Sequence, residues 1–216
     1  MKAEYISHMG DDLTVVNAAR VSFDKASLYA GTASDAKLIK YLAKHGHWTP
    51  FSHPQITMRY TVPIFVARQE FKHIVGFTRN EVSRRYVDDT PEFYAPEVWR
   101  SRPEGSVKQG SGDEVVIETC NGYDLGQEYQ NFSETALDFY NQLLSSNVAP
   151  EQARMVLPQS MYTSYYITGS LAAFARMVKQ RSDPHAQVEI QELAKMVDEV
   201  IRPLYPVSWD ALTNSL

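Results

Sequence analysis

Apolar residues recur every three or four positions in several segments of this chain, which is the spacing of an amphipathic helix. The pattern is clear over residues 34–42, where Ser34 is the candidate N-cap and Gly46 closes the segment. The same spacing predicts further helices over 132–144, 150–157, 170–180 and 184–202, the short one stopped by Pro158 and the last one opened by Asp183 and Pro184.

Residues 56–62 alternate between apolar and polar side chains, which predicts a half-buried strand that Pro63 ends. The same proline suits the first turn of a helix over 64–75, closed by Gly76. Residues 162–168 are a second strand candidate. Helices outnumber strands and do not alternate with them regularly, so we expect an α+β fold.

No repeat, low-complexity tract or flexible linker interrupts the chain, and we expect a single domain over residues 1–216. Proline and glycine gather between residues 88 and 112 among many polar side chains. A segment of that length without regular structure is typical of a functional lid, so we expect residues 88–112 to form a mobile loop.

The composition is that of an ordinary globular protein, with 44% hydrophobic residues, 22% charged residues and a formal net charge of -5. This acidic balance argues against a general nucleic-acid coat. Cys120 is the only cysteine, which excludes an intramolecular disulfide and a zinc site built from several thiolates. With neither a secretory signal pattern nor an apolar run of membrane-spanning length, we expect a cytoplasmic protein.

A basic stretch stands out against this acidic background. Between residues 68 and 85 there is a local excess of three positive charges, accompanied by His73, Asn80, Ser83 and Tyr86. Arginine side chains bind phosphate groups through paired hydrogen bonds, so the stretch predicts a site for a small anion. A solvated helix face held by ion pairs is the alternative.

Two other segments are candidates for anion binding. Arg181 precedes a predicted helix N-terminus that carries His185, and helix N-termini attract anions; a well-capped helix without a ligand is the alternative. Arg154 lies in the predicted short helix among apolar residues, where an arginine that faces partly into a core requires a partner.

The histidines at positions 45, 47, 53 and 73 raise the question of a metal site. No acidic cluster accompanies them, and their spacing matches neither structural zinc nor a histidine–carboxylate triad, so we expect no metal. Glycine signatures for dinucleotides and for phosphate loops are also missing from the sequence.

Separated blocks of sequence, spread over nearly the whole chain, carry a resemblance to a known family. They are AARVSF at 18–23, KHGHWTPF at 44–51, RQEFKH and NEVSRRY within 68–86, ARMVLP at 153–158 and RSDPHAQ at 181–187. In this order they resemble the flavin-dependent thymidylate synthases.

The chain departs from the usual signature of that family, which reads Arg-His-Arg, seven positions, then Ser. Here Lys72-His73-Ile74 is followed by eight positions and then Ser83. Lys72 can meet a phosphate only as a point charge, and Ile74 cannot replace a basic residue. We hypothesise that Arg79, next to the extra residue, supplies the missing guanidinium.

The resemblance implies the reductive methylation of dUMP to dTMP. FAD reduced by NADPH would supply the hydride and 5,10-methylenetetrahydrofolate the carbon. It also implies helices packed on a mixed, mainly antiparallel sheet, and a homotetramer whose active sites lie between subunits. The expected partners are therefore dUMP and other copies of this chain, without nucleic acid or membrane.

Carried over position by position, the resemblance also implies roles for individual residues. Arg181 would be catalytic, stabilising negative charge on the uracil. The implied dUMP-binding residues are Gln69, Lys72, Ser83, Arg84, Arg85, Arg154 and Arg181. The implied FAD-binding residues are Ser22, His47, Thr49, Lys72, His73, Glu81 and His185, to which the hypothesis above adds Arg79.

Ser83 is assigned to binding, because no Ser-His-Asp arrangement surrounds it in the sequence. Cys120 lies outside every matching block and is interpreted as a structural thiol. Two alternatives remain open at this point. One is a non-catalytic flavin- or nucleotide-binding protein, which the altered signature favours, and the other is a metal-dependent nucleotide hydrolase, which the histidines favour.

Overall fold

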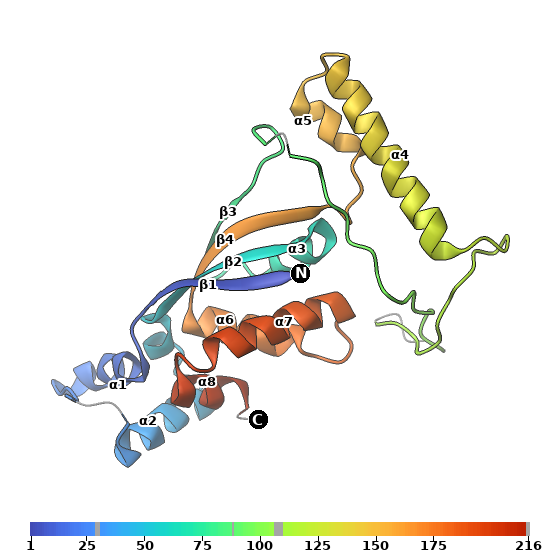
Figure 1. Ribbon diagram of the computed structural model, residues 1–216. Coiled ribbons are helices and arrows are strands. Elements are labelled where there is room, and N and C mark those ends of the chain that lie inside the picture. Colours follow the sequence, from blue (N-terminus) through green and yellow to red (C-terminus); the bar gives the residue numbers. More distant parts are fainter. Residues whose placement is uncertain (29–30, 88, 106–109, 215–216) are drawn as a thin grey trace. The chain divides into compact units, whose positions relative to one another are not determined.

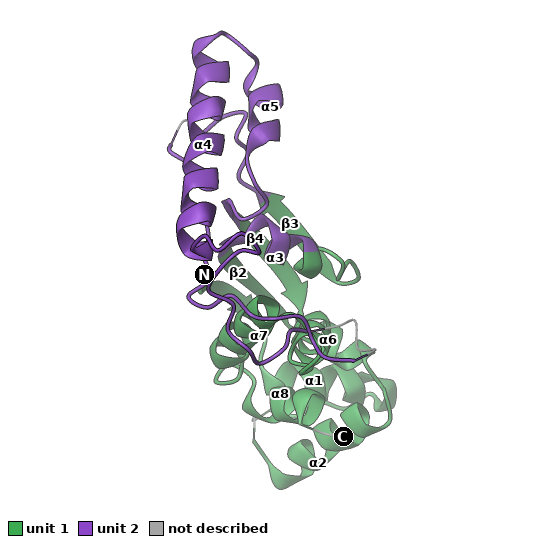
Figure 2. Cartoon of the chain, turned by 90° about the vertical axis from the view of Figure 1, so that its right-hand side faces the viewer, with its two compact units in different colours: residues 1–60, 69–80, 165–216 green, residues 61–68, 81–164 purple. Residues whose placement is uncertain are grey.

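The computed structural model describes residues 1–28, 31–87, 89–105 and 110–214 of the 216-residue chain. Its contacts divide the chain into two compact units (Figure 2). Unit 1 consists of residues 1–60, 69–80 and 165–216, and unit 2 of residues 61–68 and 81–164. The division falls inside secondary-structure elements, so both units are built from segments that are distant in sequence.

A four-stranded antiparallel sheet has the strand order β1-β2-β4-β3, and its strands are β1 (Lys2–Met9), β2 (Gln55–Pro63), β3 (Phe77–Glu81) and β4 (Tyr162–Ser170) (Figure 1). Thr57 and Thr168 meet across β2 and β4 with 3.0 Å between their hydroxyl oxygens. The predicted α+β class is confirmed, as are the strands predicted over 56–62 and 162–168.

Helices cover the sheet in unit 1, and the helix α7 packs against β1. The helices of this unit are α1 (Asp12–Arg20), α2 (Ala33–Lys44), α6 (Leu171–Arg181), α7 (Val188–Ile201) and α8 (Pro206–Thr213), with 3₁₀ turns at Val21–Phe23 and Thr49–Ser52. Their core is made of large apolar side chains that are fully buried. It includes Met58, Tyr60, Tyr165, Ile167, Phe174, Met177, Leu193, Val197 and Trp209.

Unit 2 holds the long helix α4 (Leu125–Ser145), which packs against the short helix α5 (Pro150–Ala153) and the 3₁₀ turn Arg154–Val156 that follows it. Asp124 caps α4 by accepting a 2.7 Å hydrogen bond from the backbone N–H of Gln127. The amphipathic helix predicted over 132–144 is therefore confirmed and begins earlier, because a capped first turn precedes its apolar stripe.

The helix predicted over 64–75 is shorter than expected. Helix α3 ends at Glu70 (Ile64–Glu70), where the carbonyl oxygen accepts bonds from the backbone N–H of His73 at 3.0 Å and from Nη2 of Arg79 at 3.4 Å. Gly76, at φ +83°, then turns the chain into β3. The physical reason for the early end is that a three-residue turn bond from His73 and a side-chain bond from Arg79, nine positions away, replace the helical hydrogen bond at this carbonyl.

The helix predicted over 184–202 also begins later, because α7 starts at Val188 after Gln187. The carboxylate of Asp183 accepts hydrogen bonds from the backbone N–H of His185 at 2.8 Å and from its Nδ1 at 3.0 Å, which closes a tight turn. Asp183 therefore shapes a turn instead of capping a helix, and His185 does not lie on a helical first turn. Similarly, Thr32, and not Ser34, caps α2.

The segment 88–112 contains neither a helix nor a strand within the described residues 89–105 and 110–112, while residues 88 and 106–109 lie outside them. It is anchored at Phe93, which forms an isolated bridge to Met161, and Arg100 forms another to Val115. Its mobility stays a prediction. Within the described part of the chain, no helix combines the length and apolarity needed to cross a membrane.

Candidate functional site

The best-defined part of the predicted site lies in unit 1, where Arg181 ends helix α6. Its Nε donates a 2.9 Å hydrogen bond to Nε2 of His73, and its Nη2 donates a 2.8 Å bond to the carbonyl oxygen of Gln69. A guanidinium held at two points keeps its plane fixed. Among the described residues Nη1 makes no hydrogen bond, so this end of the group has donors for an acceptor.

His73 is buried, with 7% of its surface exposed, and it is uncharged at neutral pH. Burial, followed by the positive charges of Arg181, Arg176 and Arg79, lowers the pKa of His73 to about 4. Because Arg181 donates to Nε2, the neutral ring carries its proton on Nδ1. The neutral ring therefore accepts a hydrogen bond from Arg181 and does not neutralise the positive charge of the guanidinium.

Gln69 joins this arrangement through both its main chain and its side chain. While its carbonyl oxygen accepts from Arg181, its Nε2 donates a 2.6 Å hydrogen bond to Oε1 of Gln187. Gln187 precedes α7, so the contact ties the end of α3 to the start of a helix more than 100 residues away. The structure thus brings together three predicted site residues, Gln69, His73 and Arg181.

Arg79 has a different environment from the one hypothesised. Its guanidinium forms a two-point ion pair with the carboxylate of Glu70, at 2.9 Å from Nε and 2.6 Å from Nη2. Only 14% of the Arg79 side chain is exposed, and the ring of Phe77 lies 5.0 Å from it. Arg79 is therefore committed to an interior partner, so this one of the five cationic side chains between residues 68 and 85 is not available to an anion.

The remaining predicted flavin contacts of unit 1 lie on its exterior. Ser22, His47, Thr49, Lys72 and His185 are all exposed. The ring of His47 stacks on Tyr41, with 6.2 Å between centroids. The backbone hydrogen bond from His185, more than its side-chain contact, lowers the pKa of Asp183. These residues supply hydroxyl, imidazole and ammonium donors, a set that suits phosphate and flavin oxygens.

Unit 2 brings other predicted residues together around a cavity of about 350 Å³. Glu81, Arg84 and Arg154 line it, with Tyr162, Thr163 and apolar side chains. Glu81 is oriented by a 2.7 Å hydrogen bond from the hydroxyl of Thr163. The Nη1 of Arg84 binds the carboxylate of Asp89 at 2.7 Å and also its carbonyl oxygen.

Arg154 is exposed, so the expectation that it faces partly into a core is wrong. Its Nε donates a long 3.4 Å bond to the carbonyl oxygen of Glu151, one turn earlier. The apolar neighbour Met155 is 78% exposed, which means that the 3₁₀ turn lies on the surface and lacks the buried face that the sequence pattern indicates. The arginine thus reaches the cavity from its rim.

Ser83 and Arg85, also in unit 2, contact each other. The Ser83 hydroxyl oxygen accepts from the backbone N–H of Arg85 at 3.3 Å and from its Nε at 3.4 Å, and the Arg85 guanidinium lies 5.0 Å from the ring centre of Tyr86. These contacts orient Ser83 as a hydrogen-bonding group. The assignment of this serine to binding stays a prediction.

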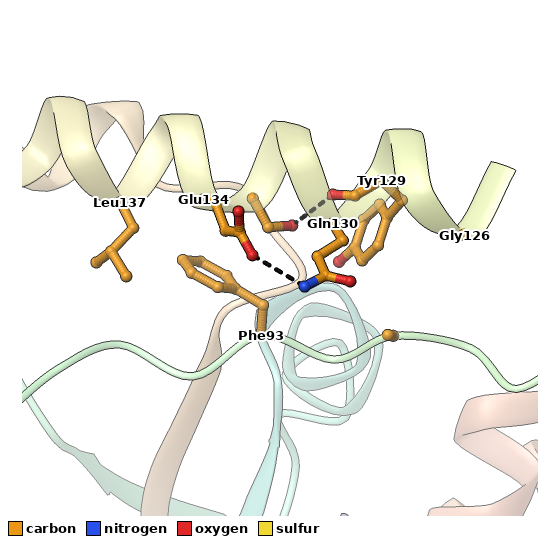
Figure 3. Close-up of a pocket in the computed structure, with 8 residues that line it drawn as sticks. Phe93, Gly126, Tyr129, Gln130, Glu134 and Leu137 are labelled. Atoms are coloured by element: carbon orange, nitrogen blue, oxygen red, sulfur yellow. Dashed lines mark hydrogen bonds between the residues drawn. The ribbon is translucent and has the colours of Figure 1, made fainter. Parts of the chain in front are cut away.

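A second cavity in unit 2, of about 310 Å³, lies along α4 (Figure 3). Phe93, Tyr129 and Leu137 contribute apolar surface, and Gln130, which also lines the cavity, donates a 2.9 Å hydrogen bond to Glu134. None of the predicted site residues lines this cavity. This cavity is therefore separate from the predicted site residues.

Sequence reasoning did not single out Glu70, which is fully buried and is the ion-pair partner of Arg79. Burial raises the pKa of Glu70, and its contacts with Arg79 oppose that shift. The available signal was that Glu70 is one of only two acidic residues, with Glu81, in the basic stretch between residues 68 and 85. Cys120 is exposed, which corrects its interpretation as a structural thiol. The described residues contain no cluster of metal-ligand side chains.

Comparison with known proteins identifies relatives over almost the full chain. The family model described as thymidylate synthase complementing protein matches residues 4–207. A flavin-dependent thymidylate synthase of Thermosipho africanus is 37% identical over 207 residues, covering 95% of this chain and 88% of that relative.

Solved structures that are similar to this chain were also found. A UMP/dUMP methylase, PolB from Streptomyces cacaoi, bound with 5-Br dUMP, is 32% identical and superimposes with a TM-score of 0.85 over 99% of this chain and 94% of that one. The same methylase bound with 5-Br UMP is aligned at 30% identity with a TM-score of 0.80, covering 99% of this chain and 93% of the other.

Proposed function

This chain belongs to the flavin-dependent thymidylate synthase family, and on that premise we propose that it converts dUMP to dTMP. The carbon comes from 5,10-methylenetetrahydrofolate and the hydride from FAD that NADPH has reduced. The observation that supports this best is the Arg181 guanidinium, fixed by His73 and Gln69. Folate leaves as tetrahydrofolate in this scheme, because the hydride is supplied by the flavin and not by the folate.

Arg181 is the residue to which we assign the catalytic role. Two of its donor groups are fixed by His73 and Gln69, so its remaining donors point in a set direction. A fixed cation stabilises negative charge that develops on a uracil ring, because it needs no reorganisation during the reaction. The neutral state of His73 preserves the full charge of Arg181 for this purpose.

Binding of the nucleotide is assigned to cationic and hydrogen-bonding side chains. Arg84 and Arg154 line the cavity of unit 2, and their guanidinium groups suit a phosphate dianion. Ser83 offers its hydroxyl to the same ligand. The full proposed set is Gln69, Lys72, Ser83, Arg84, Arg85, Arg154 and Arg181.

The residues present also fit a flavin. The proposed contacts are Ser22, His47, Thr49, Lys72, His73, Glu81 and His185, which offer hydroxyl, imidazole and ammonium donors together with one carboxylate acceptor. Bound FAD would supply the two-electron reduction that completes the methyl group. Arg79 is omitted from this set because its guanidinium is engaged by Glu70.

We extend the proposal to a cytoplasmic homotetramer with active sites between subunits. Large apolar side chains on the surface support self-association, since a solvent-exposed apolar side chain gains from burial in an interface. Phe132 and Phe139 on α4 are 58% and 49% exposed, and Trp48 is 62% exposed. The mass of the purified protein by light scattering tests this directly, with a monomer contradicting it.

A single assay tests the reaction. Purified protein is incubated with dUMP, 5,10-methylenetetrahydrofolate, FAD and NADPH, and both NADPH oxidation and dTMP are measured. We expect dTMP that requires every component and survives a chelator. Flavin uptake without dTMP would favour a non-catalytic binding protein, whereas nucleotide hydrolysis that a chelator abolishes and that needs no NADPH would favour a metal-dependent hydrolase.

UMP is a second candidate substrate, favoured by one observation: the structural relative from Streptomyces cacaoi is a UMP/dUMP methylase solved with 5-Br UMP as well as 5-Br dUMP. The same assay with UMP in place of dUMP measures this preference. Methylated product from dUMP alone would restrict the function to the deoxynucleotide.

A further inference from the structure

Glu70 is a charged residue in the interior of unit 1, with no exposed surface. Its carboxylate accepts hydrogen bonds from Nε and Nη2 of Arg79 and a third, of 3.2 Å, from the hydroxyl of Tyr165. A buried carboxylate is costly unless such partners surround it. An ion pair in this position therefore calls for a role beyond stability, since apolar residues of similar size would stabilise the interior as well.

Arg79 also contacts His73, which the Glu70 carboxylate does not reach directly. The Nη2 of Arg79 donates a 2.6 Å hydrogen bond to the carbonyl oxygen of His73. Two aromatic rings flank the guanidinium, with their centres 5.4 Å away at Phe71 and 5.0 Å away at Phe77. The ion pair therefore fixes the main chain of His73 in the turn between α3 and β3.

His73 is thus held from two sides. Arg79 holds its carbonyl oxygen, and Arg181 donates to its ring at Nε2. If the main chain at His73 shifts, the ring shifts with it and Arg181 loses the partner of its Nε. A continuous set of contacts connects Glu70, through Arg79 and His73, to the Arg181 guanidinium.

We propose that the Glu70–Arg79 ion pair positions Arg181 through His73, and that Arg79 does not itself contact flavin or nucleotide. The effect on turnover rests on the proposed function, because it assumes that Arg181 acts on the substrate. The effect on His73 does not, because it follows from contacts within the protein alone. The two can be measured separately.

The decisive variant is Arg79→Lys, which keeps the positive charge but cannot form a two-point pair and reach the His73 carbonyl at once. Long-range ¹H–¹⁵N spectra of the histidine rings report the tautomer of His73 and its pKa without any substrate. We expect wild-type His73 to be protonated on Nδ1 only. In Arg79→Lys we expect mixed tautomers and a pKa that rises toward the ordinary value of about 6.5.

Kinetics provide the second measurement. We expect Arg79→Lys to lower kcat roughly tenfold to a hundredfold, the scale of a small misplacement at an active site, with the flavin Kd within about threefold of wild type. Glu70→Gln should behave similarly. A weaker flavin affinity with an unchanged His73 spectrum would assign Arg79 to the flavin site and overturn the proposal.

A double variant shows whether Glu70 and Arg79 act as one unit or independently of each other. If Glu70 and Arg79 act together, Glu70→Gln/Arg79→Met should be no slower than the slower single variant. If the loss of kcat in the double variant equals the product of the losses in the two single variants, the proposal is overturned. Should Arg79→Met fail to fold, Arg79→Lys and Glu70→Gln still decide it through the His73 spectrum.

Asp198→Asn is the control for general destabilisation. The carboxylate of Asp198 binds Arg202 at 2.7 Å and Nε1 of Trp209 at 2.8 Å, away from His73. We expect it to lower stability and leave both the His73 spectrum and kcat unchanged. If Asp198→Asn changes His73 as Arg79→Lys does, the effect is general and positioning is refuted. If wild type shows the expected His73 spectrum but no turnover, the proposed function fails while the positioning contact stands.

Discussion

The Nε of Arg181 donates a 2.9 Å hydrogen bond to Nε2 of His73, a buried histidine whose ring is neutral. A cation thus has an uncharged partner that fixes its direction without neutralising it. Buried charges are ordinarily paired with an opposite charge, which neutralises them. This relationship gives the site its clearest chemical character, and it leads to the first two predictions.

Arg181→Ala should abolish most turnover and leave the fold intact. We expect kcat to fall by about 10² to 10³, the range measured when one group that stabilises an anionic transition state is removed. Arg181→Lys should be almost as slow, because an ammonium cannot contact His73 and the Gln69 carbonyl in the same plane. Circular dichroism checks the fold.

Lys179→Ala is the matched control, since Lys179 is an exposed cation in the last turn of the same helix. Its removal changes the charge of α6 equally but touches neither His73 nor Gln69. We expect wild-type kcat. A loss equal to that of Arg181→Ala would mean that the net charge of the helix end matters and that the geometry of Arg181 does not.

His73 should make stability depend on pH. Its pKa is about 4 in the folded protein and about 6.5 in the unfolded chain, so the unfolded state takes up a proton first as pH falls. The free energy of unfolding should therefore decrease as pH falls from about 6.5 to about 4, and this loss should be absent in His73→Asn. Urea denaturation across that range measures it.

The contribution of Glu70 to the free energy of unfolding has the opposite pH dependence and must be separated from that of His73. Because burial raises the pKa of Glu70, the folded state binds its proton more tightly, and this contribution increases as pH falls. Wild type and His73→Asn both contain Glu70, so the difference between their curves isolates the histidine. Parallel curves would contradict the predicted burial and neutrality of His73.

How far the sequence predicts this fold depends on the range of the interactions involved. The alternation of β2 is local, and Ile56, Met58 and Tyr60 are indeed fully buried. The end of α3 is set instead by Glu70 and Arg79, which are nine positions apart and meet through a turn. Periodicity cannot detect such a pair, so the pattern continued the helix to Val75.

The same contrast between local patterns and interactions of distant residues applies to the candidate site. Sequence blocks identified Gln69, His73 and Arg181, which the structure brings together, because the resemblance carries their positions directly. Counting charges could not show which of the basic side chains meet the anion, because the sequence does not reveal that Arg79 is already paired with Glu70. The apolar neighbours of Arg154 likewise indicated a buried face that does not exist, because a short 3₁₀ turn at the surface follows the same pattern.

Arg154→Ala should weaken the binding of the nucleotide through its phosphate. Arg154 lines the cavity of unit 2 with Arg84, and a charged hydrogen bond to a dianion contributes about 1.5–3 kcal/mol. We therefore expect the KM for dUMP to rise roughly tenfold to a hundredfold. Deoxyuridine, which lacks the phosphate, should bind wild type and variant equally. An equal loss for both ligands would place Arg154 against another part of the nucleotide.

Cys120→Ser should leave turnover within about twofold of wild type, since surface substitutions rarely change stability by more than about 0.5 kcal/mol. The thiol is exposed, and its Sγ lies 3.9 Å from Oδ1 of Asn121. Carbon–carbon bond formation without a cysteine nucleophile is what the flavin-dependent scheme requires. A folded but inactive Cys120→Ser protein would reopen covalent catalysis by this thiol.

Gly76→Ala should destabilise the turn that carries His73. Gly76 lies at φ +83°, which costs an alanine roughly 1–2 kcal/mol, and an added Cβ would lie 2.9 Å from Cβ of Ala173 and 3.1 Å from Oγ of Ser170. Crowding adds about 1–3 kcal/mol. Gly46→Ala is the control, because Gly46 has φ +70° with nothing within 4 Å of its added Cβ. In urea denaturation Gly46→Ala should therefore show the backbone cost alone. Equal losses in the two variants would mean that the packing of Gly76 against α6 is looser than these distances indicate.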